Sequence, residues 1–209
     1  MPNRNIGYII SKKILDLSVS SVALVFLSPL FLIIAIIIKF DKKTSRVLYQ
    51  QERVGKFGKK FKIYKFQTMV DNAELILEQD AKLHAEFISN GYKLATREDP
   101  RITKFGVFLR KTSLDELPQF WNVLIGEMSI IGPRPVVEDE LQEYGDQVDK
   151  FLSVTPGIFG LWQASGRSNI VYPARAHIEL EYVDKANLKF DFYVLFKNVI
   201  AVFKQDGAF

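Results

Sequence analysis

One uncharged apolar segment constrains the fold of this 209-residue chain more than any other feature. Residues 17–38 carry no charged side chain, and as a straight helix these 22 residues would be about 33 Å long, enough to cross a hydrocarbon core of about 30 Å. Pro29 lies near the middle, where it removes a backbone donor and presses its ring against the carbonyl group of Val25. The proline therefore predicts a bend, which the Ser28 hydroxyl deepens by donating to the Leu24 carbonyl group.

Basic residues flank the apolar segment at both ends: Lys12 and Lys13 precede it, and Lys39, Lys42 and Lys43 follow it. Positive charge tends to stay on the cytoplasmic side of a membrane. Each half of the bent helix is only about 14–17 Å long, so neither half spans a bilayer alone. We therefore expect a re-entrant helical hairpin that enters and leaves by the cytoplasmic face. A single kinked helix that spans the bilayer is the alternative, whereas the run is too long for a cleaved signal peptide.

The charge distribution indicates a negatively charged partner. The formal net charge is only +4, yet residues 39–65 contain ten Lys and Arg and only two acids. A basic block directly after an apolar segment is typical of contact with anionic lipid headgroups, and nucleic acid is the rival partner. Because the block is short and the rest of the chain is acidic, we expect membrane lipids and no nucleic acid. The absence of cysteine excludes disulfides, zinc–thiolate sites and a cysteine nucleophile, and the two histidines argue against a histidine-rich metal site.

Beyond the apolar segment, the pattern predicts both strands and helices. Residues 47–55 and 61–69 are rich in β-branched and aromatic residues around a five-residue linker, which predicts a β-hairpin. Apolar spacing and proline and glycine positions predict helices at 71–89, 115–127, 174–187 and 190–204, an extended segment at 132–135 and a loop at 155–163. The last helix carries an aromatic stripe that suits either a core or a membrane interface.

The predicted fold class is therefore α+β and mostly helical. We expect a membrane anchor with a re-entrant helix hairpin in residues 1–45. A cytoplasmic globular domain in residues 46–209 follows, with a small β-hairpin and amphipathic interfacial helices. No internal repeat or long linker divides this domain.

Two adjacent acids, Asp115 and Glu116, are the first candidates for chemistry. Ser113 and Glu116 have the spacing of a capping box, and acids in a first turn favour the helix dipole, so capping explains the pair without catalysis. Pro118 favours a helix that begins at Asp115, because its missing donor is not needed in a first turn. The start of a helix is also an anion site, where an aspartate can hold a divalent cation or attack phosphorus. Spacing alone favours capping and leaves the catalytic interpretation open.

Arginines supply the complementary charge. Arg110 shortly precedes the acid pair, and Arg134 lies between two prolines in G-P-R-P. Rigid flanks would aim the Arg134 guanidinium, whose fork geometry suits bidentate phosphate binding. Arg167 follows a glycine in S-G-R and is a further ligand candidate. A solvated surface position is the simpler explanation for any one of these arginines taken alone, except for Arg134.

A series of motifs runs along nearly the whole chain. They are K-K-I-L-D-L at 12–17, L-S-P-L at 27–30, Q-E-R-V-G-K-F-G-K-K-F at 51–61, Y-K-F-Q-T-M at 64–69, D-P-R-I-T-K-F-G at 99–106, L-R-K-T-S-L-D-E-L-P-Q at 109–119, N-V-L-I-G-E-M-S-I-I-G-P-R-P at 122–135 and P-G-I-F-G-L-W-Q-A-S-G-R at 156–167. In order and spacing, these motifs resemble those of the bacterial sugar transferases known as monotopic phosphoglycosyl transferases.

The resemblance implies an enzyme that transfers a hexose 1-phosphate from a UDP-sugar, with galactose or glucose favoured, to polyprenyl (undecaprenyl) phosphate and releases UMP. It implies that Asp115 attacks the sugar-linked phosphate and carries a covalent phosphosugar intermediate. Glu116 would assist by binding Mg²⁺ or handling a proton, so that both acids are candidate Mg²⁺ ligands. Arg110 and Arg134 would bind phosphates and Lys65 would lie near the same site, so that Lys65, Arg110, Arg134 and Arg167 are the substrate-binding candidates.

The resemblance also implies a place on the cytoplasmic face of the bacterial inner membrane, at the first membrane step of surface glycan synthesis, and it leaves a homodimer open. One departure is Gln67, where the family usually has Arg in K-F-R-[ST]-M. A neutral amide cannot replace a guanidinium at a phosphate, so this position is either no phosphate contact here or marks a subgroup. The alternatives are a membrane-attached scaffold whose acids only cap a helix, and a basic nucleic-acid binder.

Overall fold

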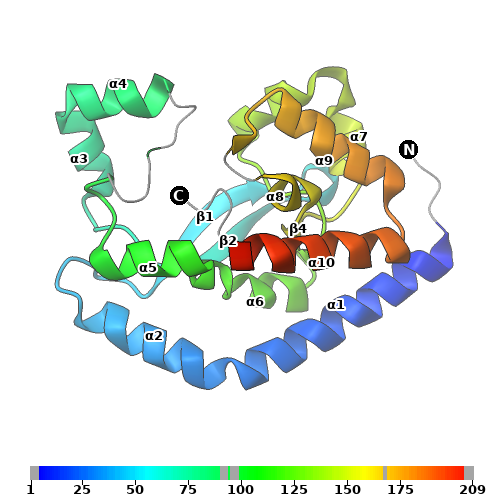
Figure 1. The fold of residues 1–209 in the computed structure, drawn as a ribbon, viewed down its shortest axis with the longest axis horizontal. Coiled ribbons are helices and arrows are strands. Elements are labelled where there is room, and N and C mark those ends of the chain that lie inside the picture. The colour runs from blue at the N-terminus through cyan, green and yellow to red at the C-terminus, as the bar shows by residue number, and fades with distance from the viewer. Residues whose placement is uncertain (1–4, 90–93, 95–98, 167–168, 205–209) are drawn as a thin grey trace.

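The computed structural model describes residues 5–89, 94, 99–166 and 169–204. The α-helices in these ranges are α1 (Ile6–Phe26), α2 (Ser28–Phe40), α3 (Ala73–Gln79), α4 (Ala81–Ser89), α5 (Lys104–Thr112), α6 (Gln119–Leu124), α7 (Val148–Leu152), α8 (Leu161–Ser165), α9 (Ala174–Lys185) and α10 (Leu188–Lys204). The strands are β1 (Leu48–Val54), β2 (Lys60–Phe66), β3 (Ser129–Ile131) and β4 (Gly157–Phe159), and the 3₁₀ segments are η1 (Lys56–Gly58), η2 (Leu114–Glu116) and η3 (Glu138–Gln147). Figure 1 shows α1 and α2 as a wide V along one side of the molecule, with the other elements above it.

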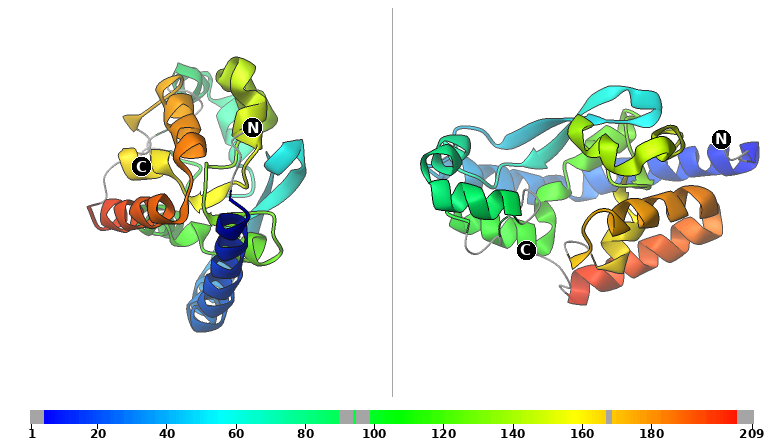
Figure 2. Two further views of the ribbon diagram at one scale, coloured as in Figure 1. Left: turned by 90° about the vertical axis from the view of Figure 1, so that its right-hand side faces the viewer. Right: turned by 90° about the horizontal axis from the view of Figure 1, so that it is seen from above.

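The predicted bend in the apolar segment is confirmed, because the chain direction changes by 59° between α1 and α2. Figure 2 shows the bent pair from one end and from above. Pro29 is the second residue of α2, where a missing amide hydrogen leaves no helical bond unmade, so the proline begins a new helix instead of kinking a continuous one. The Ser28 hydroxyl donates to the Val25 carbonyl oxygen at 2.7 Å, and the predicted partner, Leu24, is wrong. Among the described helices, none alone has the length and apolar composition to cross a bilayer, whereas this bent pair together does.

The second helix of the V packs against the elements that will form the site. Ile34 and Ile38 of α2 form a buried cluster with Phe66 of β2 and Leu109 of α5. The ring of Phe31 meets the ring of Phe66 edge-on, with 5.6 Å between the centroids. The C-terminal half of the apolar segment is therefore fixed to the rest of the fold.

Two small sheets organise the body of the molecule. The predicted hairpin is confirmed as the antiparallel pair β1 and β2. The predicted loop at 155–163 is wrong, because this stretch forms β4, which pairs in parallel with β3, and then α8. A side chain on Gly157 would overlap the backbone of Gly132, so glycine at these positions lets the two chain segments approach. This contact fixes the start of the G-P-R-P segment.

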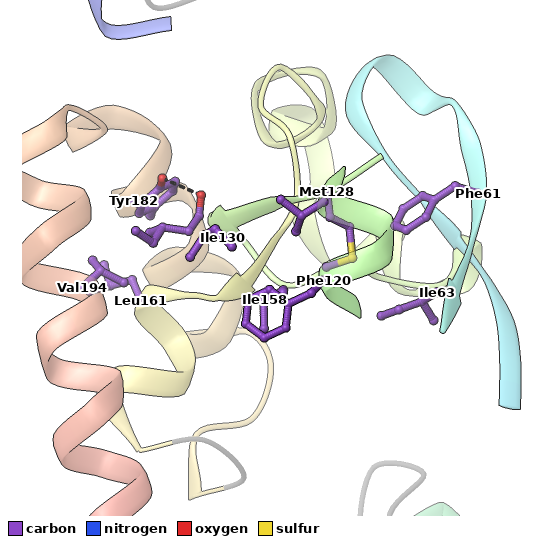
Figure 3. Packing of buried hydrophobic residues seen from close by; sticks show 11 residues of the cluster. Phe61, Ile63, Phe120, Met128, Ile130, Ile158, Leu161, Tyr182 and Val194 are labelled. Carbon is purple, nitrogen blue, oxygen red and sulfur yellow. Dashed lines mark hydrogen bonds between the residues drawn. The ribbon is translucent and has the colours of Figure 1, made fainter. Parts of the chain in front are cut away.

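The largest core cluster joins both sheets to the helices that cover them. Its labelled members in Figure 3 are Phe61, Ile63, Phe120, Met128, Ile130, Ile158, Leu161, Tyr182 and Val194. Strand β3 runs through the middle of this cluster, and the dashed bond in Figure 3 joins the Tyr182 hydroxyl to the carbonyl oxygen of Ile131 at 3.2 Å. The segment that leads to Arg134 therefore starts from the largest core cluster of the described residues.

Two helix predictions are confirmed and one is divided. The helices predicted at 174–187 and 190–204 are α9 and α10. The helix predicted at 71–89 is two helices, because the Asp80 carboxylate accepts hydrogen bonds from the backbone N–H groups of Lys82 and Leu83 and so caps a new helix, α4. On α10, Phe192 and Phe196 of the aromatic stripe face outward and are more than half exposed. The exposed aromatic part of the stripe therefore does not belong to the core, whereas Leu195 of the same stripe packs against the largest core cluster.

Candidate active site

The acid pair lies in a tight turn between two helices. Ser113 ends α5 in the left-handed region with a φ of 57°, and Asp115 and Glu116 form the single 3₁₀ turn η2. Helix α6 begins only at Gln119, with Pro118 as its N-cap. The prediction of a helix at 115–127 that starts at Asp115 is therefore wrong. Pro118 cannot lie inside a helix, as expected, but the turn at Ser113 leaves it at the helix boundary.

Neither acid caps a helix. The Ser113 side chain makes no capping hydrogen bond to η2, and α6 has no side-chain cap. The Glu116 carboxylate instead binds two cations through Oε1, with the Lys65 Nζ at 2.8 Å and the Arg134 Nη2 at 2.7 Å. The Arg134 Nη1 lies 3.4 Å from Oε2 of the same carboxylate. The capping interpretation, which spacing alone favoured, is therefore wrong, and Glu116 forms the centre of an ion-pair cluster.

The neighbouring carboxylate of Asp115 has a different environment. Asp115 is only 8 % exposed, and within the described residues its carboxylate makes no hydrogen bond and no ion pair. Burial raises the pKa of Asp115 to about 6, although the charges of Lys65, Arg110 and Arg134 oppose the rise. Asp115 is thus a buried carboxylate with free lone pairs that faces a group of cations.

Burial alone would also raise the pKa of Glu116, but Arg134 and Lys65 outweigh burial and hold this pKa below its usual range. Glu116 is therefore an anion at any physiological pH. The two adjacent acids have divided roles in the structure: Glu116 holds Lys65 and Arg134 in place, and the carboxylate of Asp115 is available to a ligand.

Three of the four predicted substrate-binding residues converge on this pair from different elements. Lys65 comes from β2 and Arg134 from the segment after β3, and both bind Glu116. Arg110 comes from the last turn of α5, and its Nε donates to the hydroxyl of Thr68 at 3.0 Å. The charge of Arg110 acts on Asp115, so the acid pair is surrounded by positive charge.

Glu179, a residue that the sequence analysis missed, binds the backbone of Arg134. Glu179 of α9 is fully buried, and its carboxylate accepts the backbone N–H of Arg134 at 3.2 Å. Burial raises the pKa of Glu179 to about 7. Its signal in the sequence was an acid within the apolar stripe of a predicted helix, since Ala176, Leu180 and Val183 share its buried face.

The remaining candidate residues make no contact with the acid pair or lie outside the described residues. Arg167 lies outside the described residues. Gln67 donates from its Nε2 to the carbonyl oxygen of Met69 at 2.7 Å, so its side chain bonds to its own segment and not to the acid pair. His84 and His177 are exposed on α4 and α9. Within the described ranges, no group of three or more histidines and carboxylates is placed to hold a metal ion.

The sequence of the chain matches a known protein family. The model of this family, which is described as bacterial sugar transferase, matches residues 7–205. The chain belongs to the bacterial sugar transferase family. The family expected from the motifs is thus confirmed.

This bacterial sugar transferase is 48% identical over 166 residues to the UDP-galactose-lipid carrier transferase of Erwinia amylovora, a match that covers 78% of the chain and 34% of that relative. It is 43% identical over 202 residues to the undecaprenyl-phosphate galactose phosphotransferase of Salmonella typhimurium, covering 95% of the chain and 41% of the relative. The exopolysaccharide production protein ExoY of Rhizobium meliloti is 41% identical over 202 residues, with 95% and 88% covered. The chain thus spans less than half the length of the first two relatives and most of the third.

Proposed function

We propose that this sugar transferase moves a hexose 1-phosphate from a UDP-sugar to undecaprenyl phosphate and releases UMP. The observation that carries the proposal is the buried carboxylate of Asp115, which has no hydrogen bond or ion pair within the described residues and lies among three cations, beside the ion-paired carboxylate of Glu116. A scaffold gains nothing from such an arrangement, because a buried carboxylate without a partner costs stability. The names of the Erwinia and Salmonella relatives support galactose as the first sugar to test, with glucose second.

In the first step, an oxygen of Asp115 attacks the phosphorus that carries the sugar. The bond from this phosphorus to the bridging oxygen breaks, UMP leaves with that oxygen, and a phosphosugar–aspartate forms. Lys65, Arg110 and Arg134 surround the position where negative charge gathers on the phosphate oxygens. In the second step, an oxygen of undecaprenyl phosphate attacks the same phosphorus and the Asp115 carboxylate leaves. The products are a lipid-linked diphosphate sugar and an unchanged enzyme.

A magnesium ion fits this residue set only together with the substrate. Mg²⁺ is commonly held by one or two carboxylates and by substrate phosphates, and two adjacent acids are available here. Asp115 has free oxygens, whereas Glu116 already binds Lys65 and Arg134. We propose Asp115 as the principal protein ligand and Glu116 as the second. The bound ion would neutralise diphosphate charge.

The pKa of Asp115 predicts the pH dependence of UMP release. A nucleophilic carboxylate must be ionised, and burial keeps Asp115 protonated up to a higher pH than an exposed aspartate. We expect the rate to fall about tenfold per pH unit below about pH 6 and to level off above it. Initial rates of UMP release between about pH 5 and 8 measure this dependence. A rate that stays constant down to pH 5 would contradict the assignment.

The helix pair supports a re-entrant anchor on the cytoplasmic face of the inner membrane. The N-terminal half of α1 binds β3 through Lys12 and Asp16, and the C-terminal half of α2 packs on Leu109. Both ends of the bent pair therefore contact one and the same domain, which a helix with ends on opposite sides of a bilayer could not do. Three further helices also expose apolar side chains, namely Phe108 of α5, Trp121 of α6 and Phe196 of α10, and Ile125 follows directly after α6. These side chains serve as further membrane-interface contacts.

The topology has a direct test in this cysteine-free chain. Single cysteines placed at Asn3 and at Lys43 lie before α1 and after α2. We expect a membrane-impermeant thiol reagent to label both from the cytoplasmic side of sealed vesicles. Labelling of the two positions from opposite sides would establish a spanning helix and overturn the re-entrant anchor.

The function itself is tested by a panel of UDP-sugars with purified protein, undecaprenyl phosphate, detergent and Mg²⁺. We expect UMP release with UDP-galactose or UDP-glucose that stops when EDTA removes the metal. If no UDP-sugar releases UMP while the protein still binds lipid vesicles, the scaffold alternative would be favoured.

A further inference from the structure

The K-K-I-L-D-L motif of the anchor has no part in the chemistry above, yet it makes the closest polar contacts between the anchor and the domain. Asp16 is buried, and its Oδ1 accepts the backbone N–H of Ile130 at 2.9 Å and the hydroxyl of Ser129 at 3.0 Å. Lys12 lies one helical turn earlier, and its Nζ donates to the carbonyl oxygen of Ile131 at 2.7 Å. Two charged residues on one face of α1 therefore hold all three residues of β3.

A second set of contacts joins Lys12 to α10. The Lys12 ammonium group forms an ion pair with Asp191 at 2.8 Å, and the Tyr182 hydroxyl donates to the other oxygen of Asp191 at 2.6 Å. The carbonyl oxygen of Ile131 accepts from Lys12 at 2.7 Å and lies 3.2 Å from the same Tyr182 hydroxyl oxygen. Lys12 is thus engaged inside the protein, whereas the sequence analysis used it only as a positive flank of the apolar segment. Removing one partner of such a buried pair leaves the other charge uncompensated.

Strand β3 is the start of the segment that carries Arg134. Ile131 is followed by Gly132, Pro133 and then Arg134, and the two prolines around Arg134 limit how this segment can bend. Glu179 holds the far side of the segment through the Arg134 backbone N–H. Gly132 is itself held, because its N–H donates to the Phe159 carbonyl oxygen at 3.1 Å and the Gly157 N–H donates to the Pro133 carbonyl oxygen at 2.8 Å. A shift of β3 is therefore passed on to Arg134.

We infer that Lys12 and Asp16 are positioning residues, which hold β3 and, through it, the Arg134 guanidinium at its place beside Glu116 and Asp115. The anchor would then be a structural part of the active site and not only a means of attachment. This inference rests on the proposed function for its kinetic consequences, but the coupling of α1 to the Arg134 segment can be measured without any turnover.

A positioning role differs from simple anchoring in what it does to the segment between β3 and Arg134. If Lys12 and Asp16 hold this segment, their loss loosens its backbone and lets the Arg134 guanidinium move away from Glu116. Loss of attachment alone would lower the amount of active enzyme and leave the backbone of residues 130–136 as it is in wild type.

The test compares Asp16→Ala and Lys12→Met with Ser20→Ala in the full chain in detergent. Ser20 is a matched control, because it is buried on the same helix but its hydroxyl, among the described residues, bonds to the carbonyl oxygens of Asp16 and Leu17 and not to β3. We expect Asp16→Ala and Lys12→Met to lower kcat by about 10- to 100-fold. Asp16→Asn keeps an acceptor oxygen for Ile130 and should recover most of the rate.

Hydrogen exchange of the 130–136 segment gives the second readout. We expect faster exchange in Asp16→Ala and Lys12→Met than in wild type and Ser20→Ala, at temperatures where all four are folded. Wild-type exchange in both variants would overturn the inference, as would an equal effect of Ser20→Ala. If the wild type itself releases no UMP, the proposed function fails, and the exchange data alone decide the coupling.

Discussion

Asp115→Asn is expected to abolish UMP release, with a loss on the order of 10⁴-fold or more. An amide is no nucleophile, and no other described carboxylate can replace Asp115, since Glu116 is bound to Lys65 and Arg134. The fold should persist, because Asn has the same shape and the wild-type carboxylate makes no hydrogen bond or ion pair within the described residues. Initial rates of UMP release and thermal melting of the purified variant measure both expectations.

The exposed aspartate Asp184 of α9 provides a matched control. Asp184→Asn makes the same chemical change outside the site and should leave UMP release unchanged. Full turnover by Asp115→Asn would show that no covalent bond forms at this residue. A melting temperature far below wild type would mean that Asp115 supports the fold in a way the contacts do not show.

Replacement of Arg134 is expected to have the second-largest effect. Arg134→Met removes a bidentate cation from both Glu116 and the proposed phosphates, and a loss of about 10²- to 10³-fold in kcat is expected. The pKa of Asp115 should also rise above about 6, because a positive neighbour that favours its ionised form is lost. The pH below which the rate falls should therefore be higher than in wild type.

Arg134→Lys separates charge from geometry. Lysine keeps the positive charge but not the planar fork, so kcat should still be lower while the pH below which the rate falls stays near its wild-type value. A wild-type rate in Arg134→Lys would show that the fork geometry is not needed. If the pH below which the rate falls is unchanged in Arg134→Met, Arg134 does not act on Asp115.

The parts of the fold that were predicted correctly depend on local signals. The hairpin of β1 and β2, the bend before Pro29 and helices α9 and α10 each follow from apolar spacing or from one proline within the element itself. The parallel pair of β3 and β4 was missed, because each strand has three residues and lies beside glycine and proline, a composition that is typical of loops. Its pairing joins segments far apart in the chain, which no local pattern encodes.

The site shows the same limit. Spacing made helix capping the best explanation for Asp115 and Glu116, because the residues that decide otherwise, Lys65 and Arg134, are 51 and 18 positions from Glu116. The family motifs supplied Lys65, Arg110 and Arg134 as substrate-binding candidates, and the structure brings all three to the acid pair. Glu179 was missed because a buried acid that binds a backbone N–H has no motif of its own.

Covalent transfer through Asp115 is the central claim. The most direct measurement is the intact mass of the protein after incubation with UDP-galactose, or with the UDP-sugar that proves active, and Mg²⁺ but without a lipid acceptor. The account predicts one hexose phosphate added per chain, located on Asp115 by peptide mapping, with an equal amount of UMP released. Undecaprenyl phosphate should then remove the adduct, and Asp115→Asn should never form it. The absence of any adduct, with UMP released only once the acceptor is present, would contradict the account and indicate direct transfer between the two substrates.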